Sequence, residues 1–261
     1  MGIYNQWDEN ALLNAVNSIL NQSLQDFEFI IYDDGSKQEV AQRILKLADL
    51  DKRIIVIGKS INHGLGYALN RCMEKATGEY IARMDADDIS MPCRLERQIA
   101  FLDTHSEYMW CGCNAVLFDE TGICGERKMP EVPSKRDYLK YSPFIHPSVV
   151  YRATVFEKTN GYCVSKETLR CEDYELFMRL YRAGYRGYNI QENLFWYREN
   201  RDSFKRRGVL PRINEAKIRY QNFKAMGILL PKGWIYVLRP ILAGFVPHRI
   251  LLWIKRNEAK M

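Results

Sequence analysis

The amino-acid sequence lacks the features that define several classes of protein. Met1 to Asn10 are polar and include no apolar segment of the kind that a secretory signal peptide requires. The seven cysteines form no Cys-x-x-Cys pair, so neither a zinc site nor a disulfide framework is indicated. No internal repeat, low-complexity stretch or long linker is present. We therefore expect a cytoplasmic protein whose cysteines are reduced and mostly buried.

The composition is that of an ordinary globular protein. Hydrophobic residues make up 47% of the 261 residues and charged residues 27%, which is far from the range of disordered chains. A chain of this length buries a full core as one large domain, or as one domain with a small appendage. The net charge of +6 is modest, and we expect no nucleic-acid partner. The sequence leaves the oligomeric state open.

Helical and strand patterns alternate in the first half of the chain. Apolar residues recur at steps of three and four in the predicted helices, and the predicted strands are short apolar runs. In order, we expect a helix from about residue 8, a strand at 27–32, a helix that buries Val40, Ile44, Leu45 and Ala48, a strand at 53–57, a helix at 65–76 and a strand at 80–84. This alternation predicts an α/β fold with a mostly parallel sheet flanked by helices, in which ligands bind at the carboxyl ends of the strands.

The second half of the chain is less regular. Strands are predicted at 108–118 and 123–129, a further strand at 145–151, and a helix at 171–183. Residues 205–261 are predicted to be helical and basic, with a change of character after Pro231.

Three carboxylates, Asp85, Asp87 and Asp88, follow directly on the predicted strand at 80–84. Alternate residues of an extended segment point the same way, so Asp85 and Asp87 can face one pocket. A divalent cation takes such oxygen ligands and relieves the repulsion among adjacent carboxylates. A solvated acidic turn is the alternative, but the apolar strand before it and two further acidic sites favour metal and nucleotide binding.

Asp34 ends an earlier strand in the same way, within Asp33-Asp34-Gly35-Ser36. Its carboxylate can accept a hydrogen bond from the imide N–H of uracil or contact a ribose hydroxyl group. A strand-to-helix turn with Ser36 as the helix N-cap is equally compatible with these residues. The segment Asn62-His63-Gly64-Leu65-Gly66 opens a predicted helix, where free backbone N–H groups suit an anion.

Glu172 and Asp173 begin the predicted helix at 171–183. A carboxylate at this position can act as the general base for an attacking hydroxyl group. The helix dipole also favours acidic residues in a first turn without any catalytic role, and spacing alone slightly favours that explanation.

Several motifs occur together in one order along the chain. They are Gly2-Ile-Tyr-Asn5, Ser18-Ile-Leu-Asn-Gln22, Phe29-Ile-Ile-Tyr-Asp-Asp-Gly-Ser36, Met84-Asp-Ala-Asp-Asp88 with Pro92 and Arg94-Leu95, His146-Pro147, Gly161-Tyr162 and Glu172-Asp-Tyr174. This ordered set spans nearly the whole chain and resembles the family 2 glycosyltransferases with the GT-A fold, a Rossmann-like nucleotide-sugar-binding fold. Within that family the sequence is most similar to exopolysaccharide and capsule enzymes.

The resemblance implies an inverting, metal-dependent enzyme. It would transfer a sugar from a nucleotide-sugar, in particular a UDP-sugar, to a hydroxyl group of a growing, lipid-linked surface polysaccharide. On the donor side, the resemblance places Tyr4 beside the base and Asp34 on uracil. It places Asp85 on the ribose or the metal-bound diphosphate and makes Asp87 a ligand of Mg²⁺ or Mn²⁺. From their position at the start of a helix, Asn62 and Gly64 are added to the candidate nucleotide-binding residues. On the acceptor side, Asp173 would be the base, and His146, Glu172 and Arg94 would line the pocket, although Arg94 could equally pair with Asp88.

The resemblance also implies a domain organisation. Residues 1–204 would form the GT-A catalytic domain, with a nucleotide-binding half at 1–100 and an acceptor half at 101–204. Residues 205–261 would form a helical C-terminal extension. Members of the family usually have a complete first strand before the Tyr-Asn pair, so Met1 to Tyr4 predict a shortened one.

The C-terminal segment combines apolar and basic residues. Trp234 and Trp253 lie among leucines and isoleucines, with Arg249, Lys255 and Arg256 between or after them. No apolar stretch reaches the roughly 20 residues that a membrane-spanning helix needs. We therefore expect peripheral association with the inner face of the cytoplasmic membrane, since a basic segment with Trp and Leu can lie in the interface. A helix that packs on the core is the alternative.

Two other functions remain compatible with the sequence. A sugar nucleotidyltransferase would share a layered α/β fold and acidic metal ligands, but it should carry a Gly-rich basic loop after its first strand, which Asn5 to Asn10 do not provide. A catalytically degenerate member of the family would bind a partner protein or a glycan without turnover. The presence of both Asp87 and Asp173 argues against this second function.

Overall fold

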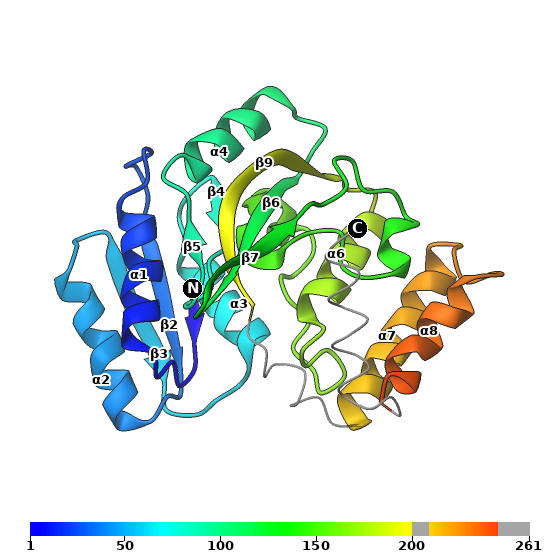
Figure 1. Cartoon of the computed structure of the whole chain (residues 1–261), viewed down its shortest axis with the longest axis horizontal. Coiled ribbons are helices and arrows are strands. Elements are labelled where there is room, and N and C mark those ends of the chain that lie inside the picture. Colours follow the sequence, from blue (N-terminus) through cyan, green and yellow to red (C-terminus); the bar gives the residue numbers. More distant parts are fainter. Residues whose placement is uncertain (200–208, 245–261) are drawn as a thin grey trace.

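The computed structural model describes residues 1–199 and 209–244 (Figure 1). The first elements are β1 (Gly2–Ile3), α1 (Glu9–Leu20), β2 (Phe29–Asp34), α2 (Gln38–Lys46), β3 (Ile54–Lys59), α3 (Leu65–Lys75), β4 (Tyr80–Ala82), β5 (Ile89–Ser90) and α4 (Arg94–Thr104). They are followed by β6 (Trp110–Asp119), β7 (Gly122–Arg127), β8 (Val150–Arg152), α5 (Thr154–Glu157), α6 (Glu172–Arg182), β9 (Gly187–Arg198), α7 (Val209–Ala225) and α8 (Gly233–Leu242). This order of helices and strands confirms the predicted α/β class.

The described strands form two sheets. β1, β2 and β3 pair in parallel, and the short β1 lies against the carboxyl half of β2, with Gly2 opposite Tyr32. The second sheet has the order β4-β8-β6-β9-β5, with β7 added to β6, and in it β6 and β9 are the parallel pair. The predicted parallel character thus applies to β1–β3 and to β6 with β9, whereas the returning strands β5, β7 and β8 pair antiparallel.

α1 shows why the local sequence folds as predicted. Asp8 is its N-cap, and the Asp8 carboxylate accepts a hydrogen bond of 2.9 Å from the backbone N–H of Ala11. Its apolar residues, at steps of three and four, are buried against β2: Leu12, Ala15, Val16 and Ile19. Each such aliphatic side chain contributes about 1.5–3 kcal/mol on burial. Helix start and buried face were therefore both predictable from the sequence.

Two local predictions were wrong. In α2, Val40 and Ile44 are buried as expected, but Leu45 is 62% exposed and Ala48 is exposed as well. The buried positions Val40, Ile44 and Leu47 are four and three residues apart, so Leu45 falls outside the face that they form. The predicted strand at 145–151 begins instead with a 3-10 helix at His146–Ser148, and its strand part is β8. Proline lacks a backbone N–H, so Pro147 suits a first helical turn better than a sheet.

α7 and α8 pack together at the end of the molecule opposite α1 and α2 (Figure 1). Their buried residues share one hydrophobic cluster with α6, including Phe223 and Val237 beside Phe177. The predicted C-terminal helices are therefore confirmed for residues 209–244. The predicted membrane residues Arg249, Trp253, Lys255 and Arg256 lie outside the described residues. None of the helices in the described ranges combines the length and apolar character that crossing a bilayer requires.

Candidate active site

The Asp85–Asp88 turn follows β4 at the edge of the second sheet. β4 ends at Ala82, and a backbone hydrogen bond of 2.9 Å from Arg83 N–H to Val149 O continues the pairing with the segment before β8. The Asp85 side chain is 31% exposed, whereas Asp88 is only 2% exposed. The turn therefore offers one carboxylate to solvent and holds another inside the protein.

The carboxylates of this turn raise one another's pKa. Burial and the neighbouring Asp85 raise the pKa of Asp87 to about 6. Burial, Asp85 and Asp87 raise the pKa of Asp88 well above its ordinary value. Asp88 Oδ1 accepts a hydrogen bond of 2.7 Å from the backbone N–H of Arg198, while Oδ2 has no hydrogen-bond partner among the described residues. This concentration of negative charge is the environment that a divalent cation stabilises.

Two arginines oppose these carboxylates, and the sequence patterns did not indicate either. Arg83 forms an ion pair with Asp85. Arg198, at the end of β9, donates a hydrogen bond of 2.9 Å from Nε to the backbone oxygen of Asp87 and lies over the ring of Phe118. Three carboxyl groups and two guanidinium groups therefore lie together at the turn.

The donor set of the turn fits a divalent cation that is bound together with a diphosphate. No group of three or more His, Cys, Asp or Glu side chains that could hold a metal by itself is found in the described ranges. Asp85 and Asp87 are a pair of oxygen ligands, and the raised pKa of Asp87 shows that this pair repels. Magnesium is commonly held by one or two carboxylates, with phosphate oxygens and water as the other ligands.

Asp34 lies at the carboxyl end of β2 and holds the loop before α3. Its carboxylate accepts hydrogen bonds from Asn62 Nδ2 at 2.8 Å, from His63 N–H at 3.0 Å and from Gly64 N–H at 2.7 Å. The anion at the start of α3 is therefore the Asp34 carboxylate itself, so the N–H groups that we expected to be free for a ligand are occupied. Gly35 allows this contact, because a Cβ at its φ of 78° would lie 2.6 Å from Asn62 N.

The turn after β1 presents Tyr4 to solvent. Asn5 has a positive φ of 50°, its backbone N–H donates to Ser36 Oγ at 2.9 Å, and its Oδ1 accepts from Lys37 N–H at 2.8 Å. Ser36 therefore braces this turn and is not the N-cap of α2, which is Lys37. Tyr4 is 54% exposed on this fixed backbone, beside the end of β2.

Glu172 and Asp173 form the first turn of α6. Burial and the neighbouring Asp173 raise the pKa of Glu172 to about 7. Glu172 Oε2 is buried and makes no hydrogen bond within the described part of the chain. Gly66 of α3 lies close to this turn, since a Cβ there would be in van der Waals contact with Tyr162 Cβ at 3.5 Å and Glu172 Cβ at 3.7 Å.

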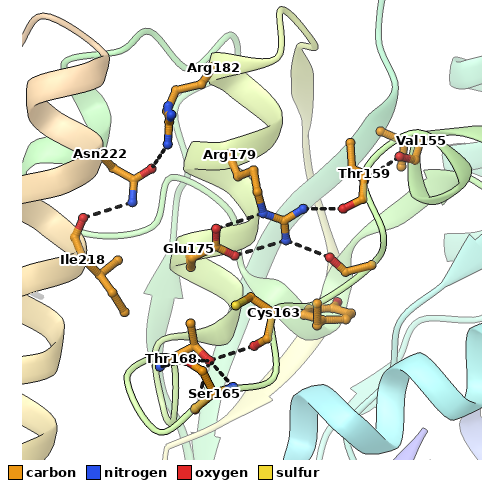
Figure 2. Close-up of polar contacts among 12 residues, drawn as sticks. Val155, Thr159, Cys163, Ser165, Thr168, Glu175, Arg179, Arg182, Ile218 and Asn222 are labelled. Carbon is orange, nitrogen blue, oxygen red and sulfur yellow. Dashed lines mark hydrogen bonds and ion pairs between the residues drawn. The ribbon is translucent and has the colours of Figure 1, made fainter.

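Arg179 anchors α6 to the loop that precedes it (Figure 2). Its guanidinium group binds both oxygens of Glu175 one turn earlier and donates to the backbone oxygens of Thr159 and Gly161, each at 2.7 Å. Figure 2 also shows Arg182 of α6 bonded to Asn222 of α7. These contacts fix the orientation of the helix that carries Glu172 and Asp173.

His146 and Arg94 lie deeper than expected. His146 is 8% exposed, and its Nε2 is 2.7 Å from the hydroxyl oxygen of Tyr162. Burial and the charge of Arg83 lower the pKa of His146, so its ring is neutral at neutral pH. Arg94 is fully buried and donates to the backbone oxygens of Pro147 and Arg83, both at 3.1 Å. Arg94 therefore supports the site from within the core and does not line an open pocket, which corrects the expectation for that residue.

The fold thus brings acids from distant parts of the chain around one buried arginine. Arg83 is paired with Asp85, and its charge also lowers the pKa of Glu172. A parallel sheet with acids at its strand ends, joined to a mixed sheet and a helix that starts with two acids, defines the class of glycosyltransferases with the GT-A fold.

Comparison with known proteins identifies the family. The model of "Glycosyl transferase family 2" matches residues 1–160. The chain belongs to this family and is a glycosyltransferase.

Relatives with described roles are similar over almost their whole length. The chain is 39% identical to the putative glycosyltransferase EpsE of Bacillus subtilis, over 96% of this chain and 90% of the relative. It is 29% identical to the amylovoran biosynthesis glycosyltransferase AmsE of Erwinia amylovora, over 100% and 98% of the two chains. It is also 29% identical to an Escherichia coli UDP-Gal:alpha-D-GlcNAc-diphosphoundecaprenol beta-1,3-galactosyltransferase, over 95% and 90%. All three relatives are glycosyltransferases by name.

Solved structures agree on the fold. The mannosyltransferase PcManGT of Pyrobaculum calidifontis, in complex with GDP-Man and Mn²⁺, has a TM-score of 0.62 at 17% identity, over 100% of this chain and 79% of that one. TarS of S. aureus, in complex with UDP-GlcNAc, has a TM-score of 0.64 at 17% identity, over 95% and 81%. At these identities the likeness concerns the fold alone.

Proposed function

We propose that this protein is an inverting glycosyltransferase that transfers a sugar from a UDP-sugar to a hydroxyl group of a growing, lipid-linked surface polysaccharide. One observation carries the proposal: the buried Arg83 forms an ion pair with Asp85, next to the candidate metal ligand Asp87, and its charge also acts on Glu172 at the start of α6. Sugar transfer needs such an arrangement, with a site for the leaving diphosphate beside a base for the attacking hydroxyl group.

On the donor side, Asp85 and Asp87 would hold Mg²⁺ or Mn²⁺ with the diphosphate. When bound, the cation offsets the negative charge that develops on the leaving group. The exposed ring of Tyr4 is free to lie against the base. Asp34, with Asn62 and Gly64, forms the wall beside it, and a remaining lone pair of the Asp34 carboxylate would accept the uracil imide N–H.

On the acceptor side, we assign the role of base to Asp173. Glu172, with a pKa of about 7, is partly protonated at neutral pH, and a base must be ionised when the hydroxyl group attacks. In its ionised form Glu172 would accept a hydrogen bond that orients the acceptor. The acceptor oxygen then bonds to the anomeric carbon, the bond to the diphosphate oxygen breaks, and the proton passes to Asp173. A single displacement of this kind inverts the anomeric configuration.

The α7–α8 pair suggests where a lipid-linked acceptor is met. α8 exposes four apolar side chains, and Trp234, Ile235, Leu238 and Leu242 are 42%, 67%, 46% and 58% exposed. Arg239 Nη1 donates to the backbone oxygen of Lys140 at 3.4 Å, so a basic loop borders this face. We therefore assign catalysis to residues 1–204 and peripheral contact with anionic lipid to the 205–261 extension.

The test is release of UDP from a panel of UDP-sugars with Mn²⁺, with and without a chelator, and with Asp87→Asn as matched control. We expect chelator-sensitive release with one donor, which an undecaprenyl-diphosphate-linked glycan accelerates. UDP binding without turnover of any donor would favour a binding module. Formation of a UDP-sugar from a sugar 1-phosphate and UTP would instead favour a nucleotidyltransferase.

A further inference from the structure

Arg83 is a buried cation whose role lies outside the donor and acceptor assignments above. Its side chain is 3% exposed, and Nη1 forms an ion pair with Asp85 Oδ1. Apart from this contact of Nη1 with Asp85, the guanidinium nitrogens have no hydrogen-bond partner in the described part of the chain. A guanidinium group carries five N–H donors, so most of them lack an acceptor in this protein by itself.

The backbone fixes where this guanidinium group lies. Arg83 N–H donates to Val149 O at 2.9 Å, and Arg83 O accepts from Arg94 Nη2 at 3.1 Å. The residue is thus held by the segment before β8 on one side and by α4 on the other. A side chain so fixed and so buried cannot turn into solvent to satisfy its donors.

The positive charge of Arg83 acts on both halves of the site. On the donor side it forms an ion pair with the Asp85 carboxylate. It also lowers the pKa of Glu172 and of His146 on the acceptor side. One fixed charge therefore influences the ionisation of groups that come from different elements of the fold.

Other buried arginines of the chain have a different set of partners. Arg94 donates to two backbone oxygens, and Arg219 donates to Leu139 O at 2.8 Å while it pairs with Glu215 on its own helix. Such contacts hold segments of the fold together. Arg83 makes no contact of this kind through its side chain, and its ion-pair partner is a candidate metal ligand.

We propose that Arg83 is a positioning residue that couples the donor site to the acceptor site. It orients the Asp85 carboxylate toward the metal-bound diphosphate, and its charge favours the ionised form of Glu172 and the neutral form of His146. The proposal rests on the proposed function, because it takes Asp85 as a metal ligand and Glu172 as an acceptor contact.

Two substitutions separate the roles of shape and charge, and a third is the control. Arg83→Lys keeps the charge but loses the planar fork, whereas Arg83→Met loses both. Arg219→Met removes a similarly buried arginine that lies over Tyr174 but whose ion-pair partner is Glu215 and not an acid of the site. For each variant the thermal midpoint, the affinity for Mn²⁺ in the presence of UDP, and kcat between pH 6 and 9 are measured.

We expect Arg83→Lys to lower kcat about 10- to 100-fold, as a misdirected reacting group does, with the wild-type pH profile. In Arg83→Met we expect a similar loss, together with a shift of the acidic limb of kcat to higher pH by about 1 unit, because Glu172 loses a favourable charge. Mn²⁺ should bind Arg83→Met at least as tightly as the wild type, since a nearby positive charge is gone. A merely structural defect would weaken metal binding instead.

The proposal is overturned if Arg83→Met resembles Arg219→Met, with a lower midpoint but wild-type kcat per folded molecule and an unshifted pH profile. It is also overturned if folded Arg83→Met loses Mn²⁺ binding. If the wild-type protein binds neither Mn²⁺ nor UDP, the proposed function itself is contradicted. If the wild type is active but Arg83→Met behaves in one of the two ways just described, only the coupling role of Arg83 is contradicted.

Discussion

Replacing Asp87 by asparagine is expected to stabilise the metal-free protein while it removes the response to metal. The carboxylate lies in a buried turn beside Asp85, so its charge is unfavourable until a cation arrives. Asparagine has almost the same shape and no charge. The substitution therefore measures the free energy that the buried negative charge costs, without changing the shape of the turn.

The size of the effect follows from the pKa of Asp87. In the folded protein it is about 6, against an ordinary value of 3.8. For an acid with a raised pKa, the loss of stability is absent below the ordinary value, grows as the pH rises between the two values, and is complete above the folded one. A shift of about two units corresponds to an upper limit of about 3 kcal/mol, or roughly 6–12 °C in the unfolding midpoint of a chain of this size.

The assay compares unfolding midpoints in a chelator at pH 4 and at pH 7.5, and then with Mn²⁺ and UDP. At pH 4 wild type and Asp87→Asn should be similar, and at pH 7.5 the variant should be the more stable. Mn²⁺ with UDP should raise the midpoint of the wild type only. The reasoning is refuted if the variant is no more stable than wild type at pH 7.5 in chelator, or gains as much from Mn²⁺.

Asp85→Asn is the matched control for this experiment, and the expected sign is opposite. Asp85 pairs with the buried Arg83, so its loss leaves the guanidinium group without its counterion. We expect a loss of about 1–3 kcal/mol at pH 7.5. A gain in stability on substituting Asp87 and a loss on substituting Asp85 would not both arise from a general disturbance of the turn.

Three further outcomes are expected. Asp173→Asn should lower sugar transfer by about 10²- to 10⁴-fold and leave UDP affinity unchanged in calorimetry, and near-normal transfer would contradict its role as base. The rate of sugar transfer by the wild type should rise as the pH passes through about 7, because Glu172 loses its proton there. Glu172→Gln should abolish this rise. If the rate of the Gln variant still rises, Glu172 is not the group responsible. The full chain should co-sediment with anionic liposomes at low salt and less at high salt, and truncation after Pro231 should release it. Truncation also removes the buried Val237, so a double variant with Trp234→Ser and Leu238→Ser, which changes exposed residues only, is the better test of release. If the wild type does not bind the liposomes at low salt, the membrane proposal is refuted.

The sequence by itself determined the elements whose causes are local. Asp8 caps α1 because its side chain reaches an N–H only three residues away, and the apolar spacing of α1 selects its buried face. Asp34 ends β2 and Asp85 comes shortly after β4, because strands are short apolar runs that end where polar residues begin. The order of motifs along the chain was also sufficient to identify the family.

Tertiary structure decided what depends on residues far apart in the chain. Arg198 contacts Asp88 from a position 110 residues later, so no local pattern could link them. Asp34 was predicted to contact the ligand. Its carboxylate accepts hydrogen bonds from the loop before α3, 28 to 30 residues later in the chain, and no local pattern predicts these bonds.

Burial was the other property that only the tertiary structure decided. Arg94 and Arg83 are both arginines near the acidic turn, but one donates to backbone oxygens within the core and the other faces carboxylates. Leu45 was assigned to the apolar face of α2 and is still exposed, because it lies one residue off the face that Val40 and Ile44 form. Whether a side chain is buried, and how far its pKa moves, depends on the elements packed around it, and the sequence does not state their positions.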